Sequence, residues 1–205
     1  AWISALLVAF LAIPFGYWLS PLFALILVAY LVINLLYSRW LKHVPILDVL
    51  IISSGFVLRV AAGVALIYPV ERFSPWLYMI TILFSLYIGL GKRRAELNLL
   101  AQGASAHRKV FDGYTIPLLD QYITIVSGMT IVAYSLYTFS APNLPENHTM
   151  MLTIPFVVYG IFRYLQLIQI GHAAGSPDEV ALKDRPLQVT VLLWGLTVLA
   201  IFYIS

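Results

Sequence analysis

The sequence contains no cysteine, and only 10% of its 205 residues are charged. The lack of cysteine excludes disulfides, thiolate metal sites and cysteine nucleophiles. Soluble domains carry about 25% charged residues, whereas this chain combines its low charge with 61% hydrophobic residues and a mean hydropathy of +0.92. These values exclude an ordinary soluble domain. They indicate an integral membrane protein, so the bilayer is its expected partner. Nucleic acid is not an expected partner.

Apolar runs of membrane-spanning length occur along the whole chain. A helix needs roughly 20 apolar residues at about 1.5 Å each to cross the hydrocarbon core of a bilayer. Seven runs come close to this length, at 2–19, 21–37, 46–67, 75–90, 117–139, 150–170 and 187–204. The sequence therefore predicts an all-α fold, a polytopic membrane bundle of seven transmembrane helices that forms a single domain over residues 1–205.

The basic residues are unequally divided between the connections that join these runs. Seven helices place alternate connections on the same side of the membrane, and one set, 38–45, 91–116 and 171–186, contains nine of the twelve Lys and Arg residues. The opposite set contains only Arg72. Because positively charged loops remain in the cytoplasm, we expect a multi-pass protein of the cytoplasmic (inner) membrane with its long charged loops on the cytoplasmic side.

The segment 87–114 has the highest density of basic residues, with five of the twelve. Topology and attraction to anionic lipid usually explain a run such as Lys-Arg-Arg. Topology does not require the carboxylates that lie beside the cations in these connections, which are Asp48, Glu96, Asp112 and Asp184. Their presence favours a binding site for an anionic ligand at the membrane surface.

Two arginines fall within apolar runs, where lipid exposure of the charge costs several kcal/mol. On a helix, Asp48, Gly55 and Arg59 share one face. This face either lines a cavity in which Arg59 meets a phosphate, or it pairs Arg59 with a structural acceptor. Arg163 shares a face with Gln166 and is either part of the same cavity wall or part of an interhelical hydrogen-bond cluster without a ligand.

Several segments together resemble a known family. Tyr37 with Lys42 and Asp48, and the GxxLR pattern of residues 55–59, are similar to the UbiA-type superfamily of intramembrane prenyltransferases. The segments GKRRAEL, HRKVFDGYT, FRYLQL and DRPLQVTVLLW resemble more closely its branch of polyprenyl-phosphate phosphoribosyltransferases, the decaprenyl-phosphate group. The resemblance extends over essentially the whole chain.

This resemblance implies nine helices around a central cavity, with Mg²⁺ and a diphosphate at its cytoplasmic mouth. The chain offers seven helices and lacks the family's first aspartate-rich motif, NDxxDxxxD. Two helices and this motif, with the main Mg²⁺ ligands, would precede Ala1 in an intact protein. We therefore expect an N-terminally truncated fragment that is itself inactive.

The resemblance also implies a reaction, the transfer of 5-phosphoribosyl from phosphoribosyl diphosphate to a polyprenyl (decaprenyl) phosphate with release of diphosphate. Prenyl-diphosphate users of the superfamily carry a second aspartate-rich motif where this chain has GKRRAE. A cation-rich segment suits direct contact with additional phosphates. Two alternatives remain open: a related prenyltransferase that acts on an aromatic or quinone-precursor acceptor, and a non-catalytic transporter or scaffold.

The expected site residues follow from the matching motifs. Lys92 and Arg93 are expected to contact the donor phosphates, and Glu96 is expected to orient a cation, a ribose hydroxyl or a Mg²⁺-bound water. Asp184 is expected to position the cations at the cytoplasmic mouth, whereas for Asp120 the role of a charge near a helix N-terminus is favoured over a catalytic one. The substrate-binding candidates are Tyr37, Lys42, Asp48, Arg59, Tyr87, Arg108, Lys109, Tyr114, Arg163, Lys183, Asp184 and Arg185.

Overall fold

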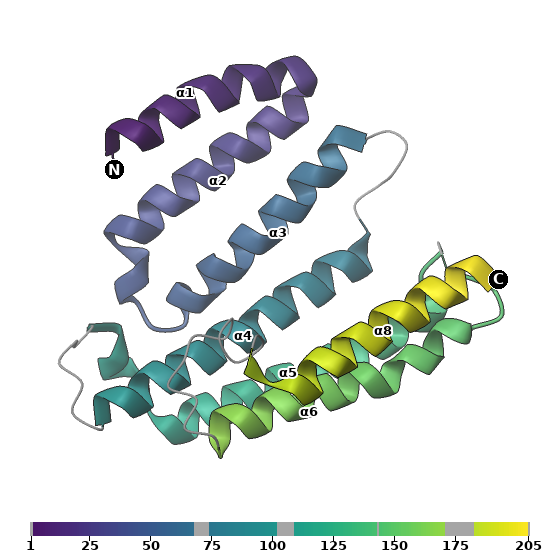
Figure 1. The fold of residues 1–205 in the computed structure, drawn as a ribbon. Coiled ribbons are helices and arrows are strands. Elements are labelled where there is room, and N and C mark those ends of the chain that lie inside the picture. The colour runs from purple at the N-terminus through teal and green to yellow at the C-terminus, as the bar shows by residue number, and fades with distance from the viewer. Residues whose placement is uncertain (1, 68–73, 102–108, 143, 171–182, 205) are drawn as a thin grey trace. The chain divides into compact units, whose positions relative to one another are not determined.

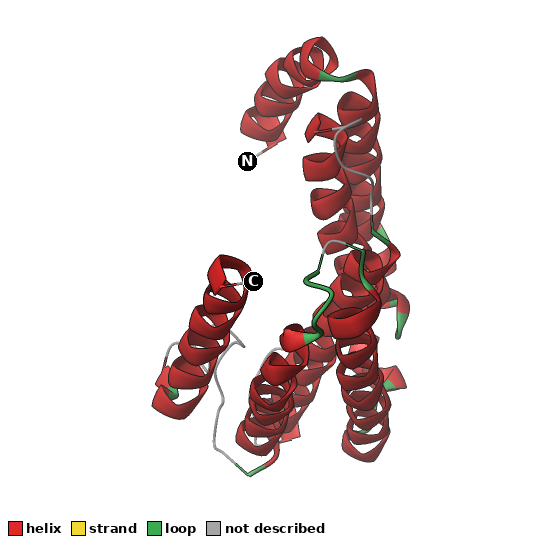
Figure 2. Cartoon of the chain, turned by 90° about the vertical axis from the view of Figure 1, so that its right-hand side faces the viewer, coloured by secondary structure: helices red, strands yellow, loops and turns green. Residues whose placement is uncertain are grey.

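The computed structural model describes residues 2–67, 74–101, 109–142, 144–170 and 183–204, which form helices and no strand (Figures 1 and 2). The α-helices in this part of the chain are α1 (Trp2–Leu19), α2 (Pro21–Arg39), α3 (Leu47–Ile67), α4 (Pro75–Ala101), α5 (Ile116–Ser140), α6 (Ile154–Gln169) and α8 (Arg185–Ile204). Six stretches, beginning with α2, are long and apolar enough to cross a membrane. The predicted all-α, polytopic membrane fold is confirmed.

One predicted boundary is wrong. The run expected to end at residue 90 continues as helix to Ala101, so the segment GKRRAE lies within α4 and not in a loop. Hydropathy falls at Lys92, but Lys, Arg, Ala, Glu and Leu all have high helix propensity, and no proline follows to end the helix. A helix can therefore extend beyond the apolar stretch that crosses the hydrocarbon, and here it carries the predicted catalytic residues.

The chain divides into two compact units, residues 1–82 and 83–205. In the first, α1, α2 and α3 lie side by side (Figure 1). Ser20 caps α2 by accepting a hydrogen bond from the backbone N–H of Phe23 at 3.4 Å, and Pro21 occupies the first turn, where its missing N–H costs no hydrogen bond. The short 3-10 helix η1 (Leu41–His43) then connects α2 to α3.

The second unit contains α4 from Leu83 onward, with α5, α6 and α8, and the 3-10 helices η2 (Lys109–Gly113) and η3 (Thr149–Thr153). Pro155 lies in the first turn of α6, directly after η3, so the predicted run over 150–170 is a 3-10 turn followed by an α-helix. Thr115 caps α5 through the backbone N–H of Leu118 at 3.3 Å.

Arg94 holds one end of the second unit together. Its Nε lies 2.5 Å from Oδ1 of Asp120 on α5, and its Nη1 donates to the carbonyl oxygen of Ile168 on α6 at 2.6 Å. The last turns of α4 and α6 thus meet the start of α5. The C-terminal ends of α4 and α6 therefore lie at the same end of the unit. Asp120 is an ion-pair partner of Arg94 in addition to lying near a helix start.

A second hydrogen-bond network joins α5, η3 and α8 away from Arg94. The hydroxyl groups of Tyr134 on α5 and Thr153 lie 2.7 Å apart, and the indole N–H of Trp194 on α8 donates to the same Tyr134 oxygen at 2.7 Å. Both Tyr134 and Thr153 are buried. These bonds satisfy polar groups that would otherwise be costly inside a membrane protein, and they fix the ring of Trp194.

Removal of the Asp120 charge should loosen the second unit. We expect Asp120→Asn to lower the free energy of unfolding by about 1–3 kcal/mol, because a largely buried guanidinium loses a charged acceptor. Thermal unfolding in detergent measures the effect, with Glu146→Gln on an exposed loop as the matched control. Arg94→Gln combined with Asp120→Asn should cost less than the two single changes together. Equal stability of Asp120→Asn and the control would contradict this role.

Candidate functional site

Two of the predicted catalytic residues pair with each other on α4. Nη1 of Arg93 lies 2.7 Å from Oε2 of Glu96, one helical turn away, and only 5% of Arg93 is exposed. Lys92 is exposed beside them. Glu96 was expected to orient a cation, a ribose hydroxyl or a Mg²⁺-bound water, and in the structure it pairs with the cation of Arg93. The carboxylate therefore fixes a buried guanidinium, and an exposed ammonium lies next to it.

Arg163 and Asp184 form a bidentate pair between α6 and the start of α8. Nη2 of Arg163 lies 2.7 Å from Oδ2 of Asp184, and its Nε lies 3.2 Å from Oδ1. The guanidinium also donates to Oε1 of Gln166 at 2.9 Å, as the shared helix face predicted. Asp184 was expected to position the cations at the cytoplasmic mouth, and the structure shows it paired with the intramembrane Arg163.

Asp184 also begins α8. Its Oδ1 accepts a hydrogen bond from the backbone N–H of Leu187 at 2.9 Å, which is the bond of a helix N-cap. The hydrogen bond from Arg163 lowers the pKa of the Asp184 carboxyl below its ordinary value, and the Leu187 bond acts in the same direction. The carboxylate is therefore charged at neutral pH, and it links α6 to the first turn of α8.

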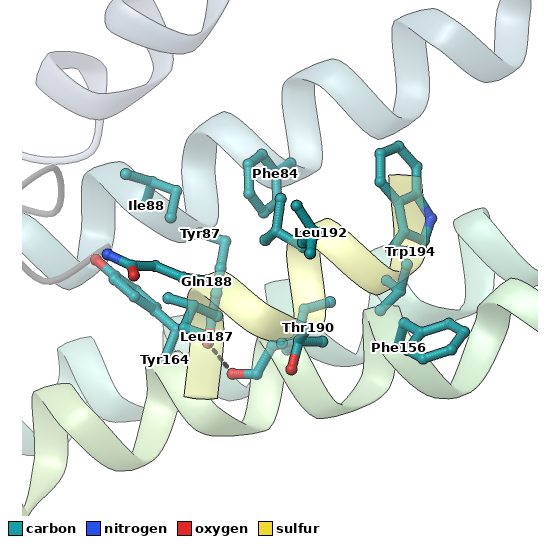
Figure 3. Close-up of a pocket in the computed structure, with 14 residues that line it drawn as sticks. Phe84, Tyr87, Ile88, Phe156, Tyr164, Leu187, Gln188, Thr190, Leu192 and Trp194 are labelled. Atoms are coloured by element: carbon teal, nitrogen blue, oxygen red, sulfur yellow. Dashed lines mark hydrogen bonds between the residues drawn. The ribbon is translucent and has the colours of Figure 1, made fainter. Parts of the chain in front are cut away.

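An apolar pocket of about 670 Å³ lies between α4, α6 and α8 in the second unit (Figure 3). Most of its lining is aliphatic or aromatic. Tyr164 and Gln188 lie at one end of the pocket, and Phe156 and Trp194 lie at the other. The complete lining is Phe84, Tyr87, Ile88, Phe156, Val157, Gly160, Ile161, Tyr164, Leu187, Gln188, Thr190, Val191, Leu192 and Trp194.

The wall of this pocket is built around two buried tyrosines. The rings of Tyr87 and Tyr164 meet edge to face with centroids 5.2 Å apart, and the Tyr87 hydroxyl donates to the carbonyl oxygen of Ile161 at 2.6 Å (Figure 3). Tyr87 was a substrate-binding candidate, and here the backbone of α6 accepts its hydroxyl hydrogen. Gly91 allows this packing, because an added Cβ would lie 2.7 Å from the Tyr164 hydroxyl oxygen.

A smaller cavity of about 260 Å³ lies between α2 and α3 in the first unit. It is lined by Gly55 and Arg59, as the helix-face pattern predicted, but Asp48 of the same pattern is not part of the lining. The other lining residues are Tyr30, Ile33, Asn34, Tyr37, Ile51, Ile52 and Phe56. Nη2 of Arg59 donates to the Tyr30 hydroxyl at 2.6 Å, and its guanidinium lies over the rings of Tyr30 and Phe56, at 5.2 and 4.8 Å from their centroids. The arginine thus has a structural acceptor and also faces a cavity.

The other predicted residues are scattered. Asp48 is fully buried in the first turn of α3, and Tyr114 is buried beyond η2. Lys42, Lys183 and Arg185 are exposed at or near helix ends. Arg108 lies outside the described residues, and of Lys109 only the backbone is described. Within the described ranges, no group of three or more His, Cys, Asp or Glu side chains could hold a metal ion.

Fold and site together define a polytopic helical membrane protein with an apolar pocket between α4, α6 and α8 and with paired arginines on α4 and α6. The sequence is 34% identical over 209 residues to a decaprenyl-phosphate phosphoribosyltransferase of Mycolicibacterium smegmatis, an alignment that covers 97% of this chain and 64% of the relative. Proteins with the same name from Mycobacterium tuberculosis and Corynebacterium glutamicum are 34% and 32% identical, over 89% and 88% of this chain and 60% and 54% of their own lengths.

No family model matches the sequence. The chain spans 54–64% of the length of these curated relatives. The similarity nevertheless extends over most of the present sequence, and the relatives carry the name that the GKRRAEL and DRPLQ segments suggested. The predicted resemblance to the decaprenyl-phosphate phosphoribosyltransferase branch is thereby confirmed.

The close approach of α4 to Tyr164 should make Gly91 intolerant of a side chain. We expect Gly91→Ala to lower the free energy of unfolding by about 1–3 kcal/mol, because the new methyl group must displace a buried ring. Thermal unfolding in detergent measures this loss. Gly160→Ala is the matched control, since its Cβ would meet only Leu187 Cδ1 at 3.9 Å. Tyr164→Phe should restore part of the stability lost in Gly91→Ala. A Gly91→Ala protein as stable as the control would rule out the steric argument.

Proposed function

We propose that the protein, at its full length, transfers a 5-phosphoribosyl group from phosphoribosyl diphosphate to a polyprenyl phosphate. The observation that carries this proposal is the similarity, over 97% of the chain, to a relative named decaprenyl-phosphate phosphoribosyltransferase. The geometry of the second unit agrees with it, since basic side chains and an apolar pocket lie along the same helices. An enzyme acting on a lipid phosphate needs both features.

The reaction is a displacement at the anomeric carbon of the donor. An oxygen of the lipid phosphate forms a bond to this carbon, and the bond from the carbon to the diphosphate oxygen breaks. The electron pair of that bond leaves with the diphosphate, and the lipid product is a phosphodiester. Because the lipid phosphate is already anionic near neutral pH, the reaction depends on orientation and charge stabilisation more than on a general base.

The residues of α4 are assigned to the donor. The exposed ammonium of Lys92 contacts a phosphate of phosphoribosyl diphosphate, and Arg93 adds a fixed positive charge because Glu96 restrains its guanidinium. Glu96 is therefore a positioning residue for Arg93. Arg163 has its position fixed by Asp184 and Gln166, and it lies next to Tyr164, at the polar end of the pocket.

Mg²⁺ is proposed as the cofactor on the resemblance alone, because diphosphate is a leaving group that a divalent cation neutralises. The described side chains do not form a cluster of three ligands for it, so no step is assigned to the metal. We also propose that the end of the second unit with Arg93, Arg94 and Arg163 faces the cytoplasm. The unequal distribution of basic residues among the connections supports this orientation. Membership of the wider UbiA-type superfamily remains a prediction.

Transfer of radiolabelled phosphoribose to a lipid-soluble product, with full-length protein in membranes, tests the proposal. We expect a product from phosphoribosyl diphosphate and decaprenyl phosphate. We expect Lys92→Ala to lower kcat/KM for phosphoribosyl diphosphate by about 10- to 100-fold, through the loss of one charged phosphate contact.

Arg39→Ala, which removes an exposed cation from the last turn of α2, is the matched control and should leave the rate near that of the unaltered protein. No lipid product from the folded, full-length protein would refute the proposed reaction. Turnover of a prenyl diphosphate in its place would favour a related prenyltransferase.

A further inference from the structure

We propose that the pocket between α4, α6 and α8 binds the isoprenoid chain of the lipid acceptor, in the part of the chain nearest to the phosphate. This proposal rests on the proposed function and adds to it a location for the lipid. A polyprenyl chain offers no hydrogen-bonding group, so its site must be recognised by shape and by an apolar lining. The 670 Å³ pocket, lined mostly by aliphatic and aromatic side chains, has both properties.

The two ends of the pocket differ in a way that orients an amphiphile. Tyr164 and Gln188 lie at one end (Figure 3). Gln188 is one helical turn beyond Asp184, with its backbone N–H bonded to the Asp184 carbonyl oxygen at 3.1 Å, and Tyr164 follows Arg163 directly in α6. Asp184 neutralises Arg163, but Arg185, an exposed cation in the first turn of α8, lies three residues before Gln188. An anionic headgroup therefore finds positive charge at this end. With its headgroup at this end, the isoprenoid chain of the lipid extends along the pocket toward Trp194.

The opposite end of the pocket is a fixed wall. Trp194 cannot turn away freely, because its indole N–H is bonded to the Tyr134 hydroxyl, which is itself bonded to Thr153. From Leu187 to Trp194 the pocket follows eight residues of α8, and the seven steps between them span about 10 Å at the rise of an α-helix. This length accommodates only the first isoprene units of a long chain, so the remaining units must leave the pocket and continue into the bilayer.

Gly160 provides a way to fill the pocket without disturbing its walls. It lines the pocket on α6, and an added Cβ would meet only Leu187 Cδ1, at 3.9 Å. A larger side chain at this position therefore projects into the space assigned to the lipid. Gly128 on α5 is the matched position outside the pocket, because it is exposed and an added Cβ would have no neighbour within 4 Å.

Kinetics of the full-length protein in membranes test this assignment. We expect Gly160→Leu to lower kcat/KM for decaprenyl phosphate by about 10- to 100-fold, as a few misplaced methyl groups do in apolar pockets. KM for phosphoribosyl diphosphate should remain nearly unchanged. Gly128→Leu should retain activity with the lipid. Equal activity of Gly160→Leu and Gly128→Leu would overturn the pocket assignment while leaving the proposed reaction intact, whereas an inactive unaltered protein would refute the reaction.

A second measurement reports on binding and needs no turnover. A polyprenyl phosphate with a photoreactive diazirine near its phosphate should label α6 or α8 at the pocket in the unaltered protein. Excess decaprenyl phosphate should suppress this labelling, and Gly160→Leu should reduce it. Labelling by a diazirine phospholipid that decaprenyl phosphate does not suppress would identify the pocket as a site for ordinary bilayer lipid and overturn the proposal.

Discussion

The second unit depends on the pairing of arginines that lie at or near the membrane. A charged side chain exposed to hydrocarbon costs several kcal/mol, so each such residue needs a partner within the protein. Arg94 obtains two partners, Asp120 and the carbonyl oxygen of Ile168, and thereby ties together three helices. Arg163 is satisfied by Asp184 and Gln166, and this pair attaches the start of α8 to α6. These pairs determine which helix ends meet.

These pairs also separate a charged end of the second unit from an apolar pocket. The continuation of α4 beyond the apolar run carries Lys92, Arg93 and Glu96 to the same end of the unit as Arg94. Farther along the helices, the packing of Tyr87 on Tyr164 leaves an apolar pocket bounded by α8. A lipid phosphate has the complementary form, an anionic head on an apolar chain. The similarity to enzymes named for such a substrate therefore has a physical counterpart in this unit.

The sequence predicted the helices well because bilayer thickness and hydropathy determine where a span lies. It failed at α4, where the apolar run ends at residue 90 but the helix continues to Ala101. Helix propensity, which is high for Lys, Arg and Glu, was the neglected signal. The shared faces of Arg59 with Gly55 and of Arg163 with Gln166 were also correctly predicted, because a spacing of three or four residues fixes a helix face.

Partners on different helices could not be predicted in the same way. The bond from Arg163 to Asp184 spans 21 residues, and the bond from Arg94 to Asp120 spans 26. Nothing in the spacing of one sequence distinguishes these acceptors from other carboxylates near the same helix ends. The apolar pocket was also missed, because its lining residues resemble ordinary lipid-facing or core residues. Gln188, a polar residue within an apolar run, was the one local signal of its polar end.

The central claim is that the basic end of the second unit and the apolar pocket form one site for a lipid phosphate. A cryo-electron microscopy map of the full-length protein with decaprenyl phosphate tests it most directly. The account predicts density for the phosphate beside the end that carries Arg93 and Arg163, continuous with chain density along the wall formed by Gly160 and Leu187. Lipid density confined to another surface, or a protein helix that fills the pocket, would contradict it.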